Sequence, residues 1–274
     1  MHRRDIVRML VASAGGALLP WMRAPRRGPM APGIQLYTVR SLMRDDPVGT
    51  LSALAQIGYR EVEFAGLHGV SAGAMREALD RFDLTAPAAH EGLAELRSNA
   101  AAVFARARAL GNRYVVVPWL DVAERRTLAD YRAVAAELNA LGRAADDIGI
   151  RLGYHNHDFE LRPIAGTIPY DVLLEETDPS LVVMELDLFW LAKGGGDPAT
   201  YFARHPGRFT MVHVKDMSAD GAMVDVGQGT LDFRRIFAEA ERAGIRHAFV
   251  EHDDPGDPLA SARVSHAALA RLLS

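Results

Sequence analysis

Histidines and carboxylates gather at four points in the second half of the chain, each directly after a run of apolar residues. The four segments are GYHNHDFE from Gly153, MELDLFW from Met184, MVHVKD from Met211 and FVEHDD from Phe249. Side chains alternate between the faces of a strand. Three pairs therefore share a face, namely His155 with His157, Glu185 with Asp187, and His213 with Lys215. Grouped carboxylates repel one another and lose solvation, and a divalent cation removes that cost.

These segments predict a metal site built without sulfur. The chain has no cysteine, so its ligands are histidine, carboxylate or water, which suits Mn²⁺, Zn²⁺, Co²⁺ or Fe²⁺ and tolerates Mg²⁺. The preferred ligands are Glu160, Asp187, His213 and Glu251. Glu160 lies beyond the end of its strand and must fold back, so His155 or His157 in its place is the open alternative.

Strand-like and helix-like segments alternate eight times after residue 30, and this alternation positions the four points. The expected strands are 33–38, 60–65, 84–90, 113–119, 150–157, 181–190, 208–216 and 247–253. Strands separated by helices pair in parallel, and a closed (β/α)8 barrel takes about 250 residues. We therefore expect an α/β fold, with one TIM-barrel domain over 31–274 and its site where the strands end. An open doubly wound sheet is the alternative, but no G-x-G-x-x-G motif follows the first strand.

Charge and the N-terminal sequence limit the partners and the location. The chain has 31 Lys and Arg against 35 Asp and Glu, a net charge of −4, so general nucleic-acid binding is not expected. Residues 1–30 contain Arg3-Arg4 and a short apolar run from Met9 to Trp21. That run is too short to span a hydrocarbon core of about 30 Å. The pattern predicts a twin-arginine-like signal and export to the periplasm, with an uncleaved membrane tether or a basic tail as alternatives. No integral membrane domain is expected.

From about Gly33 to its end, the chain resembles the sugar phosphate isomerase/epimerase-like family, which has a xylose isomerase-like barrel. The motifs are GIQLYTVR, GYREVEF, GYHNHDFE, MELDLFWLAKGGGDP, RFTMVHVKD, VGQGTLDF and FVEHDDPGDP. The resemblance implies a TIM barrel with one divalent metal, most often manganese, at Asp187, His213 and Glu251. It departs at the fifth strand, where relatives with a Glu-Asn-His strand end have the glutamate at the position of His155.

The resemblance also implies proton abstraction beside a carbonyl group, giving isomerisation or epimerisation of a sugar. The candidate bases are His157, His155 and Glu251. Lys215 is expected to hold a negatively charged oxygen or to pair with Asp216. The residues expected to contact the sugar are Tyr37, Glu63, His90, Trp190 and Gln228.

An exported enzyme meets free sugars rather than phosphorylated metabolites, so we expect a non-phosphorylated keto-sugar or glycoside as the small-molecule partner. A 3-keto-glycoside lyase and an inositol or sugar dehydratase use the same enolate chemistry and stay open. A carbohydrate-binding barrel without activity is the alternative of another class. A metal-dependent endonuclease fits poorly with the acidic balance. The sequence leaves a homo-oligomer open.

Overall fold

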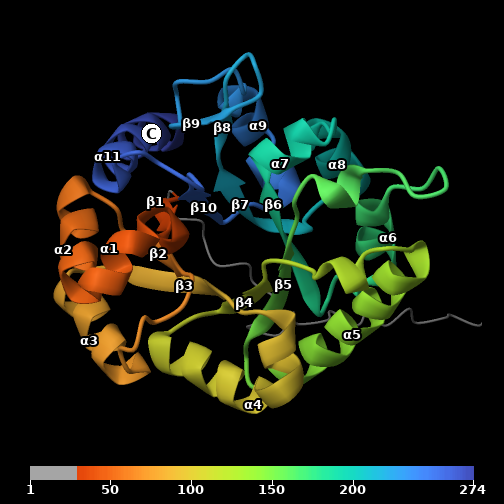
Figure 1. Cartoon of the computed structure of the whole chain (residues 1–274), viewed down its shortest axis with the longest axis horizontal. Coiled ribbons are helices and arrows are strands. Elements are labelled where there is room, and N and C mark those ends of the chain that lie inside the picture. Colours follow the sequence, from red (N-terminus) through yellow and green to blue (C-terminus); the bar gives the residue numbers. More distant parts are fainter. Residues whose placement is uncertain (1–29) are drawn as a thin grey trace, which may run out of the picture.

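Eight parallel strands close into a barrel at the centre of the molecule, as the alternating segments predict (Figure 1). The structure is a computed structural model that describes residues 30–274. Around the barrel the strands follow the order β1-β10-β7-β6-β5-β4-β3-β2. Their bounds are β1 Pro32–Gln35, β2 Glu61–Phe64, β3 Thr85–His90, β4 Tyr114–Val117, β5 Arg151–His155, β6 Val182–Asp187, β7 Phe209–Val214 and β10 His247–Val250.

Helices surround the strands and cover the outside of the barrel (Figure 1). They are α2 Pro47–Ile57, α3 Ala72–Arg81, α4 Leu93–Leu110, α5 Leu128–Asp146, α6 Pro169–Glu176, α8 Pro198–Arg204, α9 Phe233–Ala238, α10 Ala240–Ala243 and α11 Pro258–Leu273. Asp46 and Asp197 accept a backbone N–H at the starts of α2 and α8, each with proline in the first turn. Gly111, at φ 85°, ends α4 in the left-handed conformation that favours glycine.

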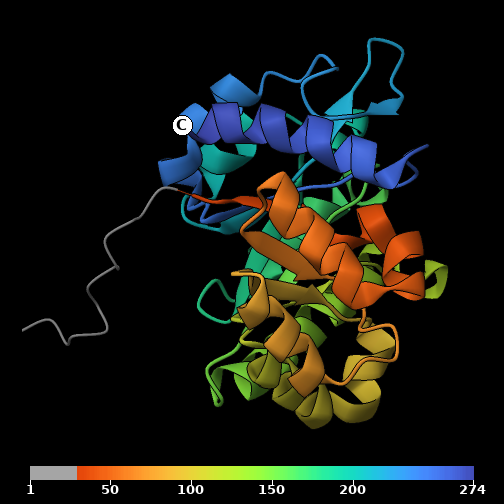
Figure 2. The ribbon, with the colours of Figure 1, turned by 90° about the vertical axis from the view of Figure 1, so that its left-hand side faces the viewer.

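The two ends of the described chain meet, which completes the ring. β1 pairs with β10 in parallel register. Figure 2 shows α11 lying across the barrel beside α2. The predicted export segment, residues 1–30, lies outside the described residues apart from Met30. Within residues 30–274, none of the helices combines the length and the hydropathy that crossing a bilayer requires.

Most of the predicted strands extend too far, and the one over 181–190 shows the reason most clearly. We expected a strand over 181–190, but β6 ends at Asp187 and helix α7 follows at Leu188–Lys193. Asp187 causes the change, because its Oδ1 accepts the backbone N–H of Trp190 at 2.8 Å and caps the helix. The short elements that we did not predict are the helical turns η2 Leu36–Val39, α1 Arg40–Asp45, η3 Val122–Glu124 and η4 Phe159–Leu161, and the hairpin of β8 Asp216–Met217 with β9 Met223–Val224.

The inside of the barrel changes from apolar to polar along the strands. A buried apolar layer, separate from the shell between strands and helices, consists of Ala88, Val116, Val183, Met211 and Phe249. Four polar residues follow members of this layer at a distance of two residues along the chain. They are His90, Glu185 and His213 within their strands, and Glu251 just after β10. Because strand side chains repeat with period two, the apolar layer and the polar groups occupy the same inward face. The apolar layer is therefore the floor on which the polar site rests.

Candidate active site

Strand register brings the histidines and carboxylates together at the carboxyl end of the barrel. β5 and β6 place His155 level with Glu185, and β6 and β7 place Asp187 level with His213. Glu251 directly follows β10, whose Phe249 is level with His213. All of these polar side chains are buried. Neighbouring strands therefore supply one compact cluster from positions up to 96 residues apart, from His155 to Glu251.

Asp187, His213 and Glu251 form the outer group of this cluster. His213 Nδ1 lies 2.7 Å from Glu251 Oε2 and 4.0 Å from Asp187 Oδ2. His155 Nε2 lies 3.7 Å from the same Asp187 oxygen. Asp187 Oδ2 is buried, and its charged partner is the ammonium of Lys215 at 3.1 Å. These oxygens and imidazole nitrogens are a suitable ligand set for a divalent cation.

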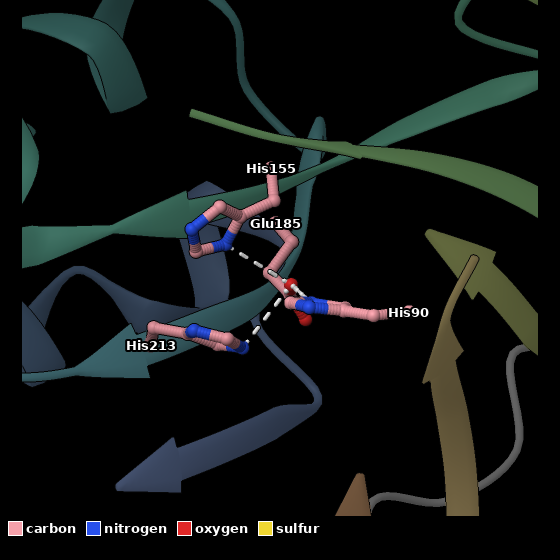
Figure 3. A group of neighbouring side chains, drawn as sticks. All are labelled: His90, His155, Glu185 and His213. Atoms are coloured by element: carbon pink, nitrogen blue, oxygen red, sulfur yellow. Dashed lines mark hydrogen bonds and ion pairs between the residues drawn. The ribbon is translucent and has the colours of Figure 1, made fainter. Parts of the chain in front are cut away.

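Glu63, Glu185 and His90 form an inner group on the other side of the two imidazoles. His213 Nε2 lies 2.7 Å from Glu63 Oε2, and His155 Nδ1 lies 3.2 Å from Glu185 Oε2. Figure 3 shows His90, His155 and His213 arranged around Glu185. An imidazole that binds a metal commonly donates its other N–H to a carboxylate, which fixes the ring. The inner carboxylates lie where they can orient both imidazoles in this way.

The inner group is itself compact enough to hold a cation. One ligand atom each from His90, His155, Glu185 and His213 lies within 4.8 Å of the others. Glu63 Oε1 and Glu185 Oε1 are buried and accept no hydrogen bond. The cluster therefore contains more buried acceptors than its own donors satisfy.

Bound protons and the ammonium group of one lysine offset the negative charge of the carboxylates in the cluster. Burial raises the pKa of Asp187 to about 6, against the lowering effects of Lys215 and His213. Burial, followed by repulsion from Glu185, raises the pKa of Glu63 to about 7. Burial alone would lower the pKa of His213, but its carboxylate neighbours outweigh burial and hold that pKa well above its usual value. A divalent cation would replace these protons, since ligands bind metals in their deprotonated forms.

Lys215 carries a buried positive charge into the outer group. Its Nζ lies 2.8 Å from Glu251 Oε2, 3.1 Å from Asp187 Oδ2 and 2.7 Å from Asp253 Oδ1. Burial would lower the pKa of Lys215, but the three carboxylates raise it above its usual value. Of the two expected uses of Lys215, pairing with Asp216 is not what the structure shows, because the Asp216 carboxylate accepts backbone N–H groups of the following loop, including those of Gly227 and Gly229.

His157 stands apart from the cluster in an aromatic surrounding. Its ring stacks on Phe159 at 5.5 Å and lies edge-to-face with Trp119 at 4.8 Å. Burial, followed by the neighbouring imidazole of His155 and the ammonium of Lys215, lowers the pKa of His157 far below its usual value. Its Nδ1 is buried and has no hydrogen-bond partner. The ring of His157 is therefore uncharged near neutral pH, and a group in the pocket would reach it at Nε2.

A pocket of about 580 Å³ opens above these groups. Most of the predicted residues line it, as do residues that we did not predict. The lining consists of Tyr37, Ala65, His90, Pro118, Trp119, His155, His157, Asp158, Trp190, Lys215, Glu251 and Asp253. The volume is within the range of about 300–1,000 Å³ that is typical of small-molecule sites. Glu63 lies deeper, in the inner group, and does not line the pocket.

Two predicted residues lie outside this arrangement. The structure does not bring Glu160 to the cluster: its Oε1 accepts the hydroxyl of Tyr154 at 2.6 Å and its Oε2 accepts the N–H of His157 at 2.8 Å. The carboxylate turns under its own loop instead of folding back to the strand end, and His155 occupies the fifth-strand position of the cluster. Gln228 is exposed and lines a separate depression beside Met223, because the β8–β9 hairpin carries its loop away from the barrel axis.

Sequence reasoning did not select Glu185 or Trp119. Glu185 stands two residues before Asp187 and shares its face of β6, so strand periodicity was the available signal. Trp119 lies just after the end of β4. Trp190 was predicted to contact the sugar because it lies after β6, so the same signal was available for Trp119. Gln35 donates from Nε2 to Glu63 Oε2 at 2.8 Å. Nothing in the sequence around Gln35 indicated this role.

Known proteins match the chain in sequence. The profile of the family described as xylose isomerase-like TIM barrel matches residues 48–272. The inosose dehydratase of Clostridium beijerinckii is 30% identical over 126 residues, which cover 39% of this chain and 42% of that protein. The inosose dehydratase of Clostridium tetani is 29% identical over 129 residues, covering 40% and 43%. The chain thus matches about two fifths of the length of these relatives.

Solved structures match the fold over almost the whole barrel. A sugar phosphate isomerase/epimerase from Parabacteroides distasonis superposes with a TM-score of 0.75 at 24% identity, covering 92% of this chain and 98% of that chain. The IOLI protein, crystallised with a bound zinc atom, gives a TM-score of 0.71 at 15% identity, covering 89% and 98%. Fold and sequence profile agree with the resemblance that the motifs indicated. The chain belongs to the xylose isomerase-like TIM barrel family.

Proposed function

We propose that this protein is a divalent-metal-dependent enzyme that removes a proton from the carbon beside a carbonyl group of a non-phosphorylated keto-sugar or glycoside. The observation that carries the proposal is the uncharged imidazole of His157, which lines the same pocket as Glu251, a member of the Asp187–His213–Glu251 group. A base without charge beside a cation-binding cluster is the combination that this chemistry needs. We propose isomerisation or epimerisation of the sugar as the overall reaction.

The outer group would hold the cation, with His155 as the fourth ligand. When bound, a divalent cation supplies Lewis-acid stabilisation of the negative charge that develops on a carbonyl oxygen. Manganese is our first choice, with zinc, cobalt, iron and magnesium as alternatives. The zinc atom in the IOLI protein supports a divalent cation in this fold without choosing among them.

The protein's own groups would move the proton. His157, which lines the pocket, takes it on Nε2, because Nδ1 is buried away from the pocket. Lys215 donates from Nζ to a substrate oxygen, and Asp187, Glu251 and Asp253 hold that ammonium in place. Glu251, which lines the pocket, returns a proton when the product is an epimer.

The lining of the pocket supports a substrate without phosphate. Among the described residues that line it, Lys215 is the only lysine or arginine. Its charge is already matched by three carboxylates. A phosphate group would meet Asp158, Glu251 and Asp253 without a free cation to offset them, whereas the hydroxyl groups of a neutral sugar can donate to carboxylates.

Dehydration is the second candidate outcome, favoured by the similarity to inosose dehydratases. It begins with the same proton removal and ends with loss of a hydroxyl group from the neighbouring carbon. Elimination of an alcohol from a 3-keto-glycoside differs only in the leaving group. A barrel that binds carbohydrate without catalysis would need none of these steps.

Hydrogen–deuterium exchange tests the shared step. The metal-loaded protein is incubated in D₂O with a 3-keto-glucoside, and deuterium at the adjacent carbon is followed by NMR. We expect exchange by the wild type, loss of exchange after chelation of the metal, and a reduction of about 10²–10⁴-fold in His157→Gln.

A histidine away from the pocket provides the matched control. His266, in α11, packs against Tyr59 and does not line the pocket. The His266→Gln variant should therefore catalyse deuterium exchange at the wild-type rate. Binding without exchange by the metal-loaded wild type would leave only a carbohydrate-binding role. Undiminished exchange by a verified metal-free sample would refute the metal dependence.

A further inference from the structure

Two large aromatic side chains at the mouth of the pocket are unusually exposed. Tyr37 is 43% exposed and Trp119 is 45% exposed, and both line the pocket above the metal-binding cluster. Tyrosine and tryptophan combine a large apolar ring with one polar group, and they are enriched where proteins bind partners. Tyr37 follows β1 and Trp119 follows β4, so they reach the pocket from separate parts of the rim.

Three neighbouring side chains pack against Trp119 and restrict its ring. The guanidinium of Arg125 lies 4.6 Å from its ring centroid and also covers Phe159. Phe159 meets the indole edge-to-face at 5.0 Å. A ring that is already fixed loses little conformational entropy when a ligand stacks on it. The exposed part of Trp119 is therefore a prepared apolar surface.

This surface begins directly beside the group that would take the proton. The rings of Trp119 and His157 are 4.8 Å apart, and His157 is 5.0 Å from His155 in the cluster. A sugar ring whose reacting carbon meets His157 lies over the cluster, so the group attached to that ring extends towards the rim. The pocket, at about 580 Å³, has room for more than one ring.

We propose that Trp119 forms a subsite for a ring attached to the reacting sugar, so that the substrate is a keto-glycoside with a cyclic aglycone and not a free monosaccharide. The aglycone is a flat or partly apolar ring, aromatic or a second sugar, that stacks on the indole. This inference rests on the proposed function and names its substrate class.

The reaction of such a substrate balances without a co-reactant. In a 3-keto-glycoside the C2–H bond breaks and its proton goes to His157. The electron pair left on C2 forms a C1=C2 double bond as the C1–O bond to the aglycone breaks. The departing oxygen takes up one proton, so the products are an unsaturated ketone and the free alcohol. The keto group is already present in the substrate, and a preceding oxidation of the glycoside must supply it.

Three substrates that differ only in the aglycone test the subsite. They are the methyl, benzyl and glucosyl 3-keto-β-glucosides, of which the methyl and benzyl alcohols are leaving groups of similar basicity. For the wild type we expect kcat/KM to favour the benzyl or glucosyl compound over the methyl compound by about tenfold, as a stacking energy of ~1.4 kcal/mol gives. In Trp119→Ala the benzyl-to-methyl ratio should fall to about one, and the glucosyl-to-methyl ratio should fall about tenfold from its wild-type value.

The ratio within each variant separates stacking from any disturbance of His157, since a displaced base slows all three substrates alike. Trp119→Phe should keep most of the preference. Val122→Ala is the matched control, because Val122 is a 64% exposed apolar residue of the same loop that does not line the pocket. Calorimetry with the same three compounds measures binding independently of turnover.

The outcomes distinguish the two proposals. An unchanged preference in Trp119→Ala, or no preference in the wild type, overturns the subsite even if all three compounds react. A preference for benzyl alone assigns the subsite to aromatic aglycones, and a preference for glucosyl alone assigns it to a second sugar. Tighter, Trp119-dependent binding of a ring-bearing compound without deuterium exchange supports the subsite and refutes the proposed function.

Discussion

Replacing Asp187 by asparagine should stabilise the cation-free protein and abolish its stabilisation by metal. Asparagine keeps the shape and the Oδ1 acceptor that caps α7 with the N–H of Trp190. It removes a carboxylate whose pKa burial raises from 3.8 to about 6. At about 1.4 kcal/mol per pKa unit, this ionised carboxylate costs the cation-free fold ~3 kcal/mol at about pH 8.

The sign of this effect sets its pH dependence. A raised folded-state pKa means that the native state binds the proton more tightly than the unfolded chain does. The native state therefore loses relative stability as the pH rises from about 4 to about 6, and the loss is complete above that window. The advantage of Asp187→Asn should accordingly be largest near pH 8 and disappear near pH 4.

Urea unfolding in the presence of a chelator measures this difference at both pH values. With Mn²⁺ or Zn²⁺ at about 1,000 times its dissociation constant, the wild type should gain ~4 kcal/mol, and Asp187→Asn should gain far less. Asp171, which pairs with Arg204 on the outside of the barrel at 3.1 Å, gives the control Asp171→Asn, expected within ~1 kcal/mol of wild type. A cation-free Asp187→Asn that is less stable than wild type at pH 8 would refute the reasoning.

Two further substitutions probe the same cluster, and a third probes Glu160 beside it. Lys215→Met leaves Asp187 and Glu251 without the lysine ammonium. In urea unfolding with a chelator present, it should lower the free energy of unfolding by ~3–5 kcal/mol, part of which added Mn²⁺ restores. An unchanged free energy of unfolding would show that the lysine is not needed for charge balance. Glu185→Gln weakens the acceptor of His155 and should reduce metal affinity about 10–100-fold by calorimetry; unaltered affinity would remove the orienting role of the inner group. Glu160→Ala strands the Tyr154 hydroxyl and the His157 N–H and should cost ~1–3 kcal/mol for each, while metal content by elemental analysis stays that of wild type; a loss of metal would restore Glu160 as a ligand.

The barrel could be predicted because each unit repeats the same signal. Apolar strand segments and helical segments alternate eight times, and the glycine and proline positions mark the helix ends. The strand predicted over 181–190, which ends at Asp187 in the structure, shows the limit of this signal. Leu188 and Phe189 continue the apolar run of β6, but the carboxylate of Asp187 captures the N–H of Trp190 and starts a helix. Such a side-chain bond depends on geometry that an apolar pattern does not record.

The cluster could be predicted where it follows strand ends and not where it depends on loops. Asp187, His213 and Glu251 come together because parallel register fixes their relative heights. Glu160 and Gln228 lie in loops, whose path depends on distant contacts such as the Tyr154 hydroxyl. Glu185 was accessible from periodicity, since it shares a strand face with Asp187. A carboxylate that supports a histidine cannot be distinguished by residue type from one that binds a metal.

The helix cap at Asp187 has a consequence for denticity. The amide of Trp190 already donates to Oδ1, so Oδ2 would be the oxygen of Asp187 best placed to bind a cation. A carboxylate that binds through one oxygen takes one coordination position, whereas a chelating carboxylate takes two. The residue that starts a helix would in this way leave room for a second oxygen of a bound sugar.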